Sequence, residues 1–417
     1  MSRVARPSNH WSTVAVLSLL LLLVSSLSAE ELKPLQPFID AASKGDIIIP
    51  PAGVYAGPVI IDEAITLDGK NGVTIDGGGK GSVIYLDTDG ASIRNLRIIN
   101  SGESHNDIDS AVQVRGNFNV IKDNVIEGTL FGIDLGQAEN NILRRNKISS
   151  KKVEIGMRGD AIRLWYSFNN KIIDNEITNS RDFVVWYSGD NVIRGNSVSG
   201  GRYSLHFMYS KFNIVEDNHF FNNNTGIFLM YSDGLQIRNN YIASATGAAG
   251  VGIGFKETSD ITIENNQILY CATGMYIDVS PYDPDSTNLM KNNLIAFNGI
   301  AVRFLNDWKG NQFFENKFKG NIAQVVVSGG GSANRNDWQG NYWDDYEGFD
   351  LDRDGTGDTP YELYAYADRL WMDVPRAQFF MGSIFLEVID FLERLAPFSE
   401  PQLLLRDQAP QLAESTT

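Results

Sequence analysis

Three side chains with metal-binding atoms recur at matching positions of consecutive sequence segments. His206 and Met208 are two residues apart, and Met230 occupies the position of Met208 in the next segment. In an extended strand, residues two apart point to the same side and are separated by about 6.6 Å. One imidazole and two flexible thioethers form a donor set that suits Cu(I). We therefore predict a copper site at His206, Met208 and Met230.

A second candidate metal site lies in an aspartate-rich segment near residue 350. Its carboxylates follow the spacing of the first part of a calcium-binding loop, with Gly355 at the sixth position. Tyr361 stands where such a loop ends in glutamate. The segment predicts a structural Ca²⁺ or Mg²⁺ site, and the alternative is a solvated acidic turn without a metal. The predicted ligands are Asp350, Asp352, Asp354, Thr356 and Asp358.

The elements that must position these residues are marked by internal repeats. The copper candidates belong to four similar segments that begin at Asp160, Asp182, Ser204 and Gly226. Eleven asparagines stand at equivalent points, 21 to 29 residues apart. They are Asn95, Asn124, Asn146, Asn175, Asn196, Asn218, Asn240, Asn266, Asn293, Asn316 and Asn341. Side-chain amides both donate and accept, so asparagines in register can form a hydrogen-bonded ladder between stacked coils.

Short apolar runs with alternating residues lie between the asparagines, and they indicate strands rather than helices. Repeats of this length with two or three strands are typical of one coil of a solenoid. We predict an all-β, right-handed parallel β-helix of about eleven coils over residues 30–346. A capping helix is expected over residues 35–43, at the open N-terminal end.

Alignment of the repeats separates inward from outward side chains. Two apolar columns should face the core: Ile162, Phe183, Leu205, Ile227, Ile253, Met275 and Val302, and Leu164, Val185, Phe207, Leu229, Phe255, Ile277 and Phe304. Trp165, Trp186, Met208 and Met230 should then stack outside the helix on four successive coils. An aromatic and thioether stripe facing solvent requires an explanation. Besides binding metal, it could pack under the loop 149–159 or against a partner protein, with Trp165, Trp186 and Phe228 as docking residues.

The N-terminus carries an export signal. Arg3 and Arg6 precede a leucine-rich apolar run, and small residues follow it. We predict that residues 1–29 form a signal peptide, cleaved after Ser28 or Ala29. The formal net charge of −16 argues against nucleic-acid partners. Cys271 is the single cysteine, so no intramolecular disulfide can form.

The C-terminal part changes its periodicity. Residues 347–374 contain the acidic loop and a connector, and residues 375–417 are expected to form a helical, partner-docking segment. Helical spacing of apolar residues predicts that this segment either caps the β-helix or docks on a membrane-embedded partner. The predicted docking residues are Phe379, Phe380, Ile384, Phe385, Val388, Phe391 and Leu392.

The four-coil block from Gly159 to Ser232, together with Gly340-Asn-Tyr-Trp-Asp-Asp-Tyr346 and the aspartate-rich loop, resembles the NosD family. This resemblance implies a periplasmic protein that associates with the membrane through a partner. It implies work with an ABC transporter membrane subunit and a copper-chaperone lipoprotein on the copper–sulfide centre of nitrous oxide reductase. Copper, as transient Cu(I), would be received on the outer face, and sulfur could be handled as well.

The rival hypothesis is a carbohydrate-binding or carbohydrate-active β-helix protein, because such proteins share this fold. Glycan cleavage needs clustered carboxylates or a base beside metal-held aspartates. In the outer column from Arg163 to Arg303, only Asp278 is a carboxylate. We therefore expect an accessory protein rather than an enzyme.

Overall fold

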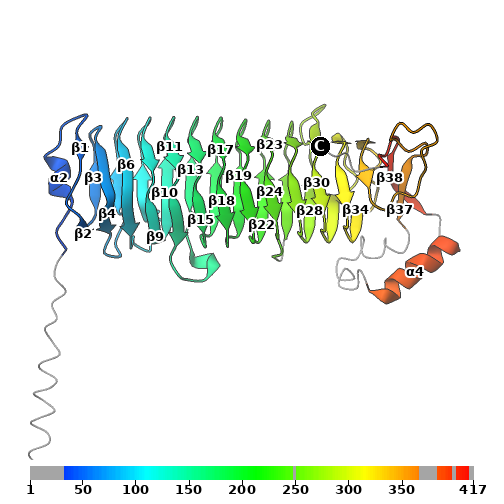
Figure 1. Cartoon of the computed structure of the whole chain (residues 1–417), viewed down its shortest axis with the longest axis horizontal. Helices are drawn as coiled ribbons and strands as arrows, with labels where there is room; N and C mark the ends of the chain where they lie inside the picture. The colour runs from blue at the N-terminus through cyan, green and yellow to red at the C-terminus, as the bar shows by residue number, and fades with distance from the viewer. Residues whose placement is uncertain (1–31, 248–249, 366–382, 397–400, 413–417) are drawn as a thin grey trace, which may run out of the picture.

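The computed structural model describes residues 32–247, 250–365, 383–396 and 401–412. The chain winds into one elongated parallel β-helix (Figure 1), which confirms the predicted fold class. One face is a 12-stranded sheet, and the other faces form a 24-stranded sheet. The coils at the N-terminal end contain no ladder asparagine. The predicted number of about eleven coils, which counted one asparagine for each coil, therefore leaves them out.

The 12-stranded sheet carries the four-coil block. Its strands are β3 (Val59–Ile61), β5 (Ile84–Leu86), β7 (Ser110–Val114), β10 (Phe131–Gly136), β13 (Ile162–Trp165), β16 (Asp182–Trp186), β19 (Tyr203–Met208), β22 (Thr225–Met230), β25 (Val251–Lys256), β28 (Thr273–Asp278), β31 (Ile300–Leu305) and β34 (Ala323–Ser328). All its pairings are parallel, so each strand lies beside the corresponding strand of the next coil.

The 24-stranded sheet contains two series of short strands. It starts with β1 (Ile47–Ile48), β2 (Gly53–Ala56), β4 (Thr66–Asp76) and β6 (Ser92–Ile99). The first series is β8 (Val120–Lys122), β11 (Ile142–Arg144), β14 (Lys171–Ile173), β17 (Val192–Arg194), β20 (Ile214–Glu216), β23 (Gln236–Arg238), β26 (Thr262–Glu264), β29 (Asn288–Lys291), β32 (Asn311–Phe314) and β35 (Asp337–Gln339). The second is β9 (Val125–Thr129), β12 (Lys147–Ser150), β15 (Glu176–Thr178), β18 (Ser197–Ser199), β21 (His219–Phe221), β24 (Tyr241–Ala243), β27 (Gln267–Leu269), β30 (Leu294–Ala296), β33 (Lys317–Lys319) and β36 (Tyr342–Trp343).

The core runs along the axis of the helix and consists of inward-facing apolar side chains. Both predicted columns, from Ile162 to Val302 and from Leu164 to Phe304, are fully buried. Alternation along each strand places every second residue inside, so the residues between them line the outer surface. The inward and outward assignment made from the repeats is therefore confirmed.

The asparagine ladder is continuous from Asn124 to Asn341. In each rung, the side-chain amide donates to the side-chain oxygen of the next asparagine, as from Asn175 Nδ2 to Asn196 Oδ1 at 3.0 Å. The same oxygen accepts the backbone N–H of Asn175 at 2.9 Å. These bonds pair buried turn groups that have no strand partner.

Asn95 was wrongly assigned to this ladder. The backbone N–H of Leu96 donates to Asn124 Oδ1 at 3.1 Å, so Leu96 occupies the rung. The Asn95 side chain donates instead to Asp68 Oδ1 at 2.8 Å, and its φ is 55°. A second ladder, which the sequence reading missed, runs through Asn119, Asn141, Asn170, Asn191 and Asn213.

Both ends of the solenoid are covered. The predicted N-terminal capping helix is present as α2 (Gln36–Asp40). At the other end, β37 (Tyr361–Ala365) pairs antiparallel with β38 (Gln402–Asp407). β38 lies within the segment that was expected to be helical, and it is a strand because Leu404 and Leu405 fill the open end of the core.

The helix α4 (Ile384–Leu395) lies between β37 and β38 in the chain, beyond the stack of coils (Figure 1). In the described part of the chain, no helix has both the length and the apolar character needed to cross a membrane. The loop after β12 contains a short 3₁₀ helix, η1 (Ile155–Met157).

Candidate functional site

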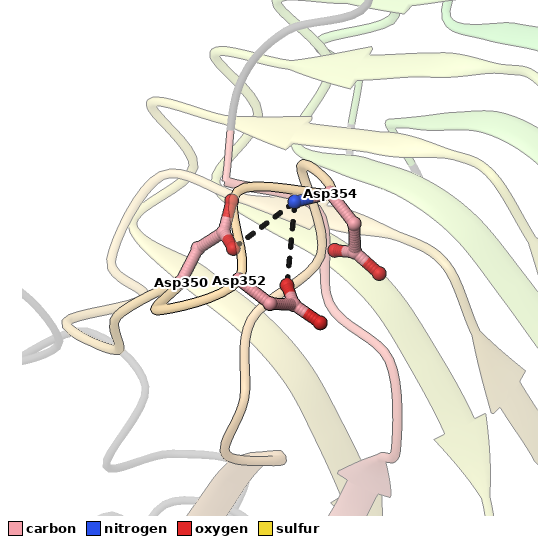
Figure 2. A group of neighbouring side chains, drawn as sticks. All are labelled: Asp350, Asp352 and Asp354. Carbon is pink, nitrogen blue, oxygen red and sulfur yellow. Dashed lines mark hydrogen bonds between the residues drawn. The ribbon is translucent and has the colours of Figure 1, made fainter.

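The aspartate-rich loop brings three of its five predicted ligands together. Carboxylate oxygens of Asp350, Asp352 and Asp354 all lie within 4.8 Å of one another (Figure 2). The Asp358 carboxylate instead accepts the backbone N–H of Leu351 at 2.6 Å. Thr356 forms a bridge to Gln411 in the C-terminal segment. The loop is therefore fixed against the C-terminal cap, and a cation there remains a prediction.

Tyr361 explains why this loop lacks the closing glutamate. Its ring is buried and stacks on Trp343, with the ring centroids 4.5 Å apart. The hydroxyl group donates to the Asp345 carboxylate at 3.1 Å. The twelfth position of the loop thus belongs to the terminal packing of the solenoid.

The predicted outer stripe is present on four successive coils. Strand register pairs Trp165 with Trp186, Trp186 with Met208, and Met208 with Met230. A parallel column pairs Val184 with His206, and His206 with Phe228. Because neighbouring strands are about 4.8 Å apart, side chains from adjacent coils can converge on one point.

The imidazole of His206 contacts a thioether of the next coil. His206 Nε2 lies 3.1 Å from Met230 Sδ. Metal bonds to imidazole nitrogen and to sulfur are about 2.0–2.3 Å long, so one small ion can contact both atoms. Met208 occupies the ladder position beside Met230 and is partly exposed. The copper candidates thus share one outer patch, in which Met230 makes the contact with the imidazole.

The expectation that His206 faces solvent is wrong. Only 6% of the residue is exposed, although it points outward from its strand. Its ring stacks on Tyr203 at 4.8 Å and meets the rings of Trp186 at 5.9 Å and Phe228 at 6.5 Å. Large aromatic neighbours on both adjacent coils therefore cover the imidazole. We call His206, Tyr203, Trp186, Phe228 and Met230 the histidine box.

Burial keeps the imidazole neutral. Desolvation lowers the pKa of His206 to about 4, and the positive charge of Arg202 adds to this effect, whereas Asp182 opposes it. A neutral imidazole offers one nitrogen lone pair to a metal without first losing a proton. His206 Nδ1 is buried and has no hydrogen-bond partner among the described residues.

A charged pair beneath the histidine box holds Tyr203 in place. Asp182 forms an ion pair with Arg202, and its Oδ1 atom accepts the backbone N–H of Tyr203 at 3.1 Å. The Arg202 guanidinium lies 5.0 Å from the centroid of the Tyr203 ring. The Asp182 carboxylate is thus neutralised by arginine and already accepts hydrogen bonds.

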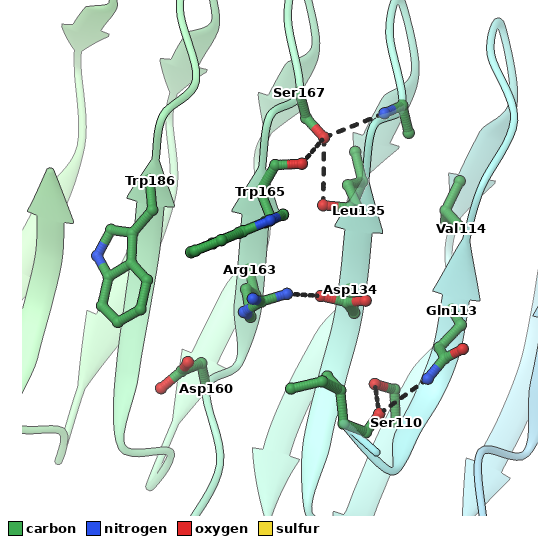
Figure 3. Close-up of polar contacts among 12 residues, drawn as sticks. Ser110, Gln113, Val114, Asp134, Leu135, Asp160, Arg163, Trp165, Ser167 and Trp186 are labelled. Atoms are coloured by element: carbon green, nitrogen blue, oxygen red, sulfur yellow. Dashed lines mark hydrogen bonds and ion pairs between the residues drawn. The ribbon is translucent and has the colours of Figure 1, made fainter. Parts of the chain in front are cut away.

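The sequence reading missed a row of buried carboxylates on the same outer face. Asp134 is fully buried and forms ion pairs with Arg115 and Arg163, both at 2.7 Å. Figure 3 shows the pair with Arg163. Asp160 pairs with Arg181 at 2.9 Å, yet burial raises the pKa of its carboxyl to about 6. The segment Phe131-Gly-Ile-Asp-Leu-Gly136 carries the same strand pattern as its neighbours and could have revealed Asp134.

Asp278, the carboxylate that was expected to have no acidic neighbour in its column, pairs with Lys256 at 3.2 Å. Its neighbours in register are Lys256 and Leu305, so no carboxylate adjoins it in its column, as expected. Asp134 lies in the parallel column of Arg163, one coil before the aligned segments.

Polar contacts of the loop 149–159 reach coils on both sides of it. Met157 O lies 3.2 Å from His105 Nε2, and Arg158 Nη1 donates to Gly200 O at 3.5 Å. Packing of the stripe under this loop stays a prediction. Met157 itself is 63% exposed.

The C-terminal helix exposes apolar side chains. Ile384, Val388, Phe391, Leu392 and Leu395 are each at least half exposed. Phe379 and Phe380 lie outside the described residues, as does the side chain of Phe385. An apolar helix surface of this size is typical of an interaction site.

Sequence comparisons relate this chain to one family of proteins. Residues 145–348 match the family model described as periplasmic copper-binding protein (NosD). A relative from Pseudomonas aeruginosa named "Probable ABC transporter binding protein NosD" is 28% identical over 92% of this chain and 91% of its own length. A protein of the same name from Stutzerimonas stutzeri is 26% identical over 92% of this chain and 90% of the relative.

Solved structures share the fold at lower identity. The A-module of a mannuronan C-5 epimerase from Azotobacter vinelandii has a TM-score of 0.56 at 14% identity, covering 70% of this chain and 90% of the module. This likeness concerns the β-helix alone. The sequence comparisons, in contrast, extend over nearly the whole chain and include the histidine box, and they show that the chain resembles NosD, a family described as periplasmic copper-binding proteins.

Proposed function

We propose that this chain is an exported accessory protein that carries Cu(I) as cargo during assembly of the copper centre of nitrous oxide reductase. Copper would be held transiently by His206 and Met230, with Met208 as a third donor on the neighbouring coil. The chain would act in the periplasm with an ABC transporter. It would receive the metal from a copper-chaperone lipoprotein, and it would catalyse no reaction itself.

The contact between His206 Nε2 and Met230 Sδ carries this proposal. A nitrogen and a sulfur donor from different coils meet there at 3.1 Å, inside a shell of aromatic rings. The imidazole is neutral, and the thioether carries no charge. A histidine beside a methionine also occurs in ordinary cores. The contact therefore supports copper binding only together with the resemblance to a copper-binding family.

The ligand set favours Cu(I) over divalent ions. Soft thioether donors select Cu(I), whereas divalent ions prefer carboxylate, water or several imidazoles. The nearest acidic group, Asp182, is paired with Arg202. Placing a divalent cation beside uncharged donors in a largely dry site costs much desolvation energy without a compensating charge.

Two surfaces are proposed to dock partners. The exposed side chains of α4, including Ile384, Val388 and Phe391, would contact the membrane subunit of the transporter. Trp165, Trp186 and Phe228 lie around the copper candidates, where the lipoprotein and the reductase would exchange metal. This arrangement is supported by the exposed apolar helix and by the transporter named in the relatives' description.

Anaerobic Cu(I) titration against a colorimetric chelator tests the proposal. The mature protein should bind Cu(I) tightly, and His206→Ala or Met230→Leu should weaken binding at least tenfold. A smaller loss is expected for Met208→Leu. His219→Ala and Met157→Leu are matched controls, because both residues are exposed and lie away from the histidine box. Unchanged binding in His206→Ala and Met230→Leu would contradict this site.

A carbohydrate function remains the second candidate because of Asp160. A carboxyl with a pKa near 6 can act as an acid or a base at neutral pH, and Trp165 lies on the same face (Figure 3). However, Asp160 forms an ion pair with Arg181, and Asp134 forms ion pairs with Arg115 and Arg163. Both carboxylates are therefore engaged in ion pairs rather than presented to a substrate. Binding or cleavage of polyuronates by a protein that does not bind Cu(I) would favour this candidate.

A further inference from the structure

An uninterrupted run of aromatic rings connects the histidine box with the protein surface. The Trp186 ring lies 5.9 Å from the ring of His206 and 6.0 Å from that of Trp165. Trp165 in turn lies 5.5 Å from Tyr166 and 5.2 Å from Tyr187, measured between ring centroids. No step from the imidazole to these tyrosines exceeds 6.0 Å.

The tyrosines themselves form a stacked ladder along the solenoid axis. Centroid distances are 5.0 Å between Tyr166 and Tyr187, 5.1 Å between Tyr187 and Tyr209, and 4.8 Å between Tyr209 and Tyr231. Neighbouring rings are nearly parallel, with interplanar angles of 7° to 13°. Tyr166 and Tyr209 are 44% and 47% exposed, so the ladder reaches solvent.

The backbone does not demand tyrosine at these positions. Each of the four has a φ near 50°, the left-handed region that bulky residues rarely adopt. The same turn is occupied by Gln137 in the coil before and by Glu257, Val279 and Asn306 in the three coils after, all with positive φ. Tyrosine thus occurs in the four coils whose strands end in Trp165, Trp186, Met208 and Met230. The position of the tyrosines therefore follows the outer stripe, and the conformation of the turn does not require them.

Stacking also limits what the ladder can bind. The faces of the rings are used by their neighbours, and the ring edges remain for solvent. A sugar stacks on an open aromatic face, so the ladder is poorly suited to glycans. Close spacing of readily oxidised side chains, in contrast, favours the movement of an electron from ring to ring. Tryptophan and tyrosine are the aromatic side chains that give up an electron most readily.

We propose that Trp186, Trp165 and the tyrosine ladder form a relay that carries oxidising equivalents from the histidine box to the surface. The proposal rests on the copper site proposed above. Bound Cu(I) reduces hydrogen peroxide, and the thioethers of Met230 and Met208 lie beside the radical that results. Oxidation of methionine to its sulfoxide would destroy the soft donors. The relay protects these donors by moving the damage to tyrosines that face solvent.

The steps balance with peroxide as the oxidant. Cu(I) gives one electron to H₂O₂, the O–O bond breaks, and Cu(II), hydroxide and a hydroxyl radical form. The radical takes a hydrogen atom from the Trp186 indole N–H, which yields water and an indolyl radical. One electron and one proton then pass from Trp165 to Trp186, and next from Tyr187 to Trp165. Two tyrosyl radicals, each produced by one such event, end as a dityrosine bond.

Peroxide challenge of the Cu(I)-loaded protein tests the relay. The variant is Trp165→Phe with Tyr187→Phe, because neither residue contacts His206 in the structure and phenylalanine preserves the packing. Wild-type protein should give a tyrosyl signal in electron paramagnetic resonance and little Met230 sulfoxide by mass spectrometry. The variant should lose most of the tyrosyl signal and gain several-fold more sulfoxide. Equal sulfoxide in both proteins would overturn the relay.

Two controls separate the relay from the copper site. Tyr270→Phe removes an exposed tyrosine that stacks on Phe297, away from the ladder, and should behave like wild type. In copper-free protein, azide radicals oxidise tryptophan selectively, and transfer to tyrosine should follow at a rate independent of protein concentration. A lower yield of tyrosyl radical in the variant supports the relay even if Cu(I) binding fails, because the stacked pair Trp343 and Tyr361 is the same in both proteins. An equal yield in both proteins contradicts the relay while leaving the copper site intact.

Discussion

His206 occupies an outward position of β19 and is nevertheless almost completely buried. Its coverage comes from aromatic side chains of three successive coils rather than from the core. A ligand in such a shell is held in one orientation and is shielded from water. In the proposed copper site, preorganised donors of this kind would lower the cost of binding, and exchange with a partner would occur through the partly exposed Met208 and Met230.

The burial of His206 predicts a pH dependence of folding stability. The folded pKa, about 4, lies below the value of 6.5 for an unperturbed imidazole. The unfolded chain therefore binds the proton more tightly, and the stabilisation present above pH 6.5 is lost as the pH falls toward 4. Replacing His206 with leucine should reduce the destabilisation between pH 7.5 and 4.5 by about 2–3 kcal/mol.

Urea unfolding at both pH values measures this difference. The carboxyl groups titrate alike in wild type and variant, so the difference between the two proteins isolates the imidazole. His219→Leu serves as the control, because it removes an exposed imidazole from the opposite sheet. An identical pH dependence in wild type and His206→Leu would contradict the burial of His206.

At this scale the sequence predicted which residues face outward but not how they are covered. Repeat alignment correctly placed Trp165, Trp186, Met208 and Met230 in one column. Burial of His206 depends on ring orientations of residues in three coils, and no local pattern encodes these. Asp134 was missed for a simpler reason, since its strand lies one coil before the segments that were aligned.

The asparagine ladder has a direction. Between asparagines, every side-chain amide donates toward the C-terminus, as from Asn196 Nδ2 to Asn218 Oδ1 at 3.0 Å. The same nitrogen also donates to a backbone carbonyl of a preceding coil, here Ile172 O at 2.9 Å. Every side-chain oxygen accepts from the preceding coil, as Asn196 Oδ1 does from Asn175. An interior rung must therefore both donate and accept, which explains why asparagine rather than aspartate fills this ladder.

Substitution of Asn196 by aspartate tests this direction. A carboxylate has nearly the same shape but cannot donate. The carbonyl of Ile172 loses this donor, and Asn218 Oδ1 keeps only the backbone N–H of residue 196. Because a buried charge is introduced as well, the free energy of unfolding should fall by at least about 2–3 kcal/mol. Asn224→Asp, at an exposed position, should change it by less than about 0.5 kcal/mol. Chemical denaturation of both variants checks this, and equal stabilities would refute the ladder's role.

Elements defined by periodicity were predicted well, and elements defined by long-range contacts were not. The central strands and α2 follow from local patterns. β38 could not be separated from a helix in the same way, because Leu403, Leu404 and Leu405 form a short apolar run without a clear period. Its partner β37 is separated from it in the sequence by the whole segment that contains α4, so no local pattern reveals this pairing.

On the scale of the whole molecule, one carboxylate ends the ladder. Asp407 of β38 is fully buried and accepts the backbone and side-chain N–H groups of Asn341 at 3.0 and 2.8 Å. It also accepts the indole N–H of Trp343 at 3.2 Å. The last rung has no further coil to donate to, so an acceptor alone suffices there.

Removal of this acceptor should loosen the C-terminal coils selectively. In Asp407→Ala, the side chains of Asn341 and Trp343 lose their partners, and hydrogen exchange in β35 and β36 should rise at least tenfold. Strands near the middle, such as β19, should exchange as in wild type. Asp407→Asn keeps one oxygen acceptor and should give an intermediate effect. Uniform exchange throughout the chain in Asp407→Ala would show that the cap does not act locally.

The hairpin of β37 and β38 has a further consequence for association between molecules. The end of a parallel solenoid exposes unpaired strand edges that match the edges at the other end, so uncapped copies would add head to tail into open filaments. The strands β37 and β38 are antiparallel, so they do not offer the parallel edge that such an addition needs. In addition, the backbone N–H of Ala333 already donates to Leu404 O at 2.8 Å. We therefore expect the hairpin of β37 and β38 to oppose the growth of filaments at high concentration.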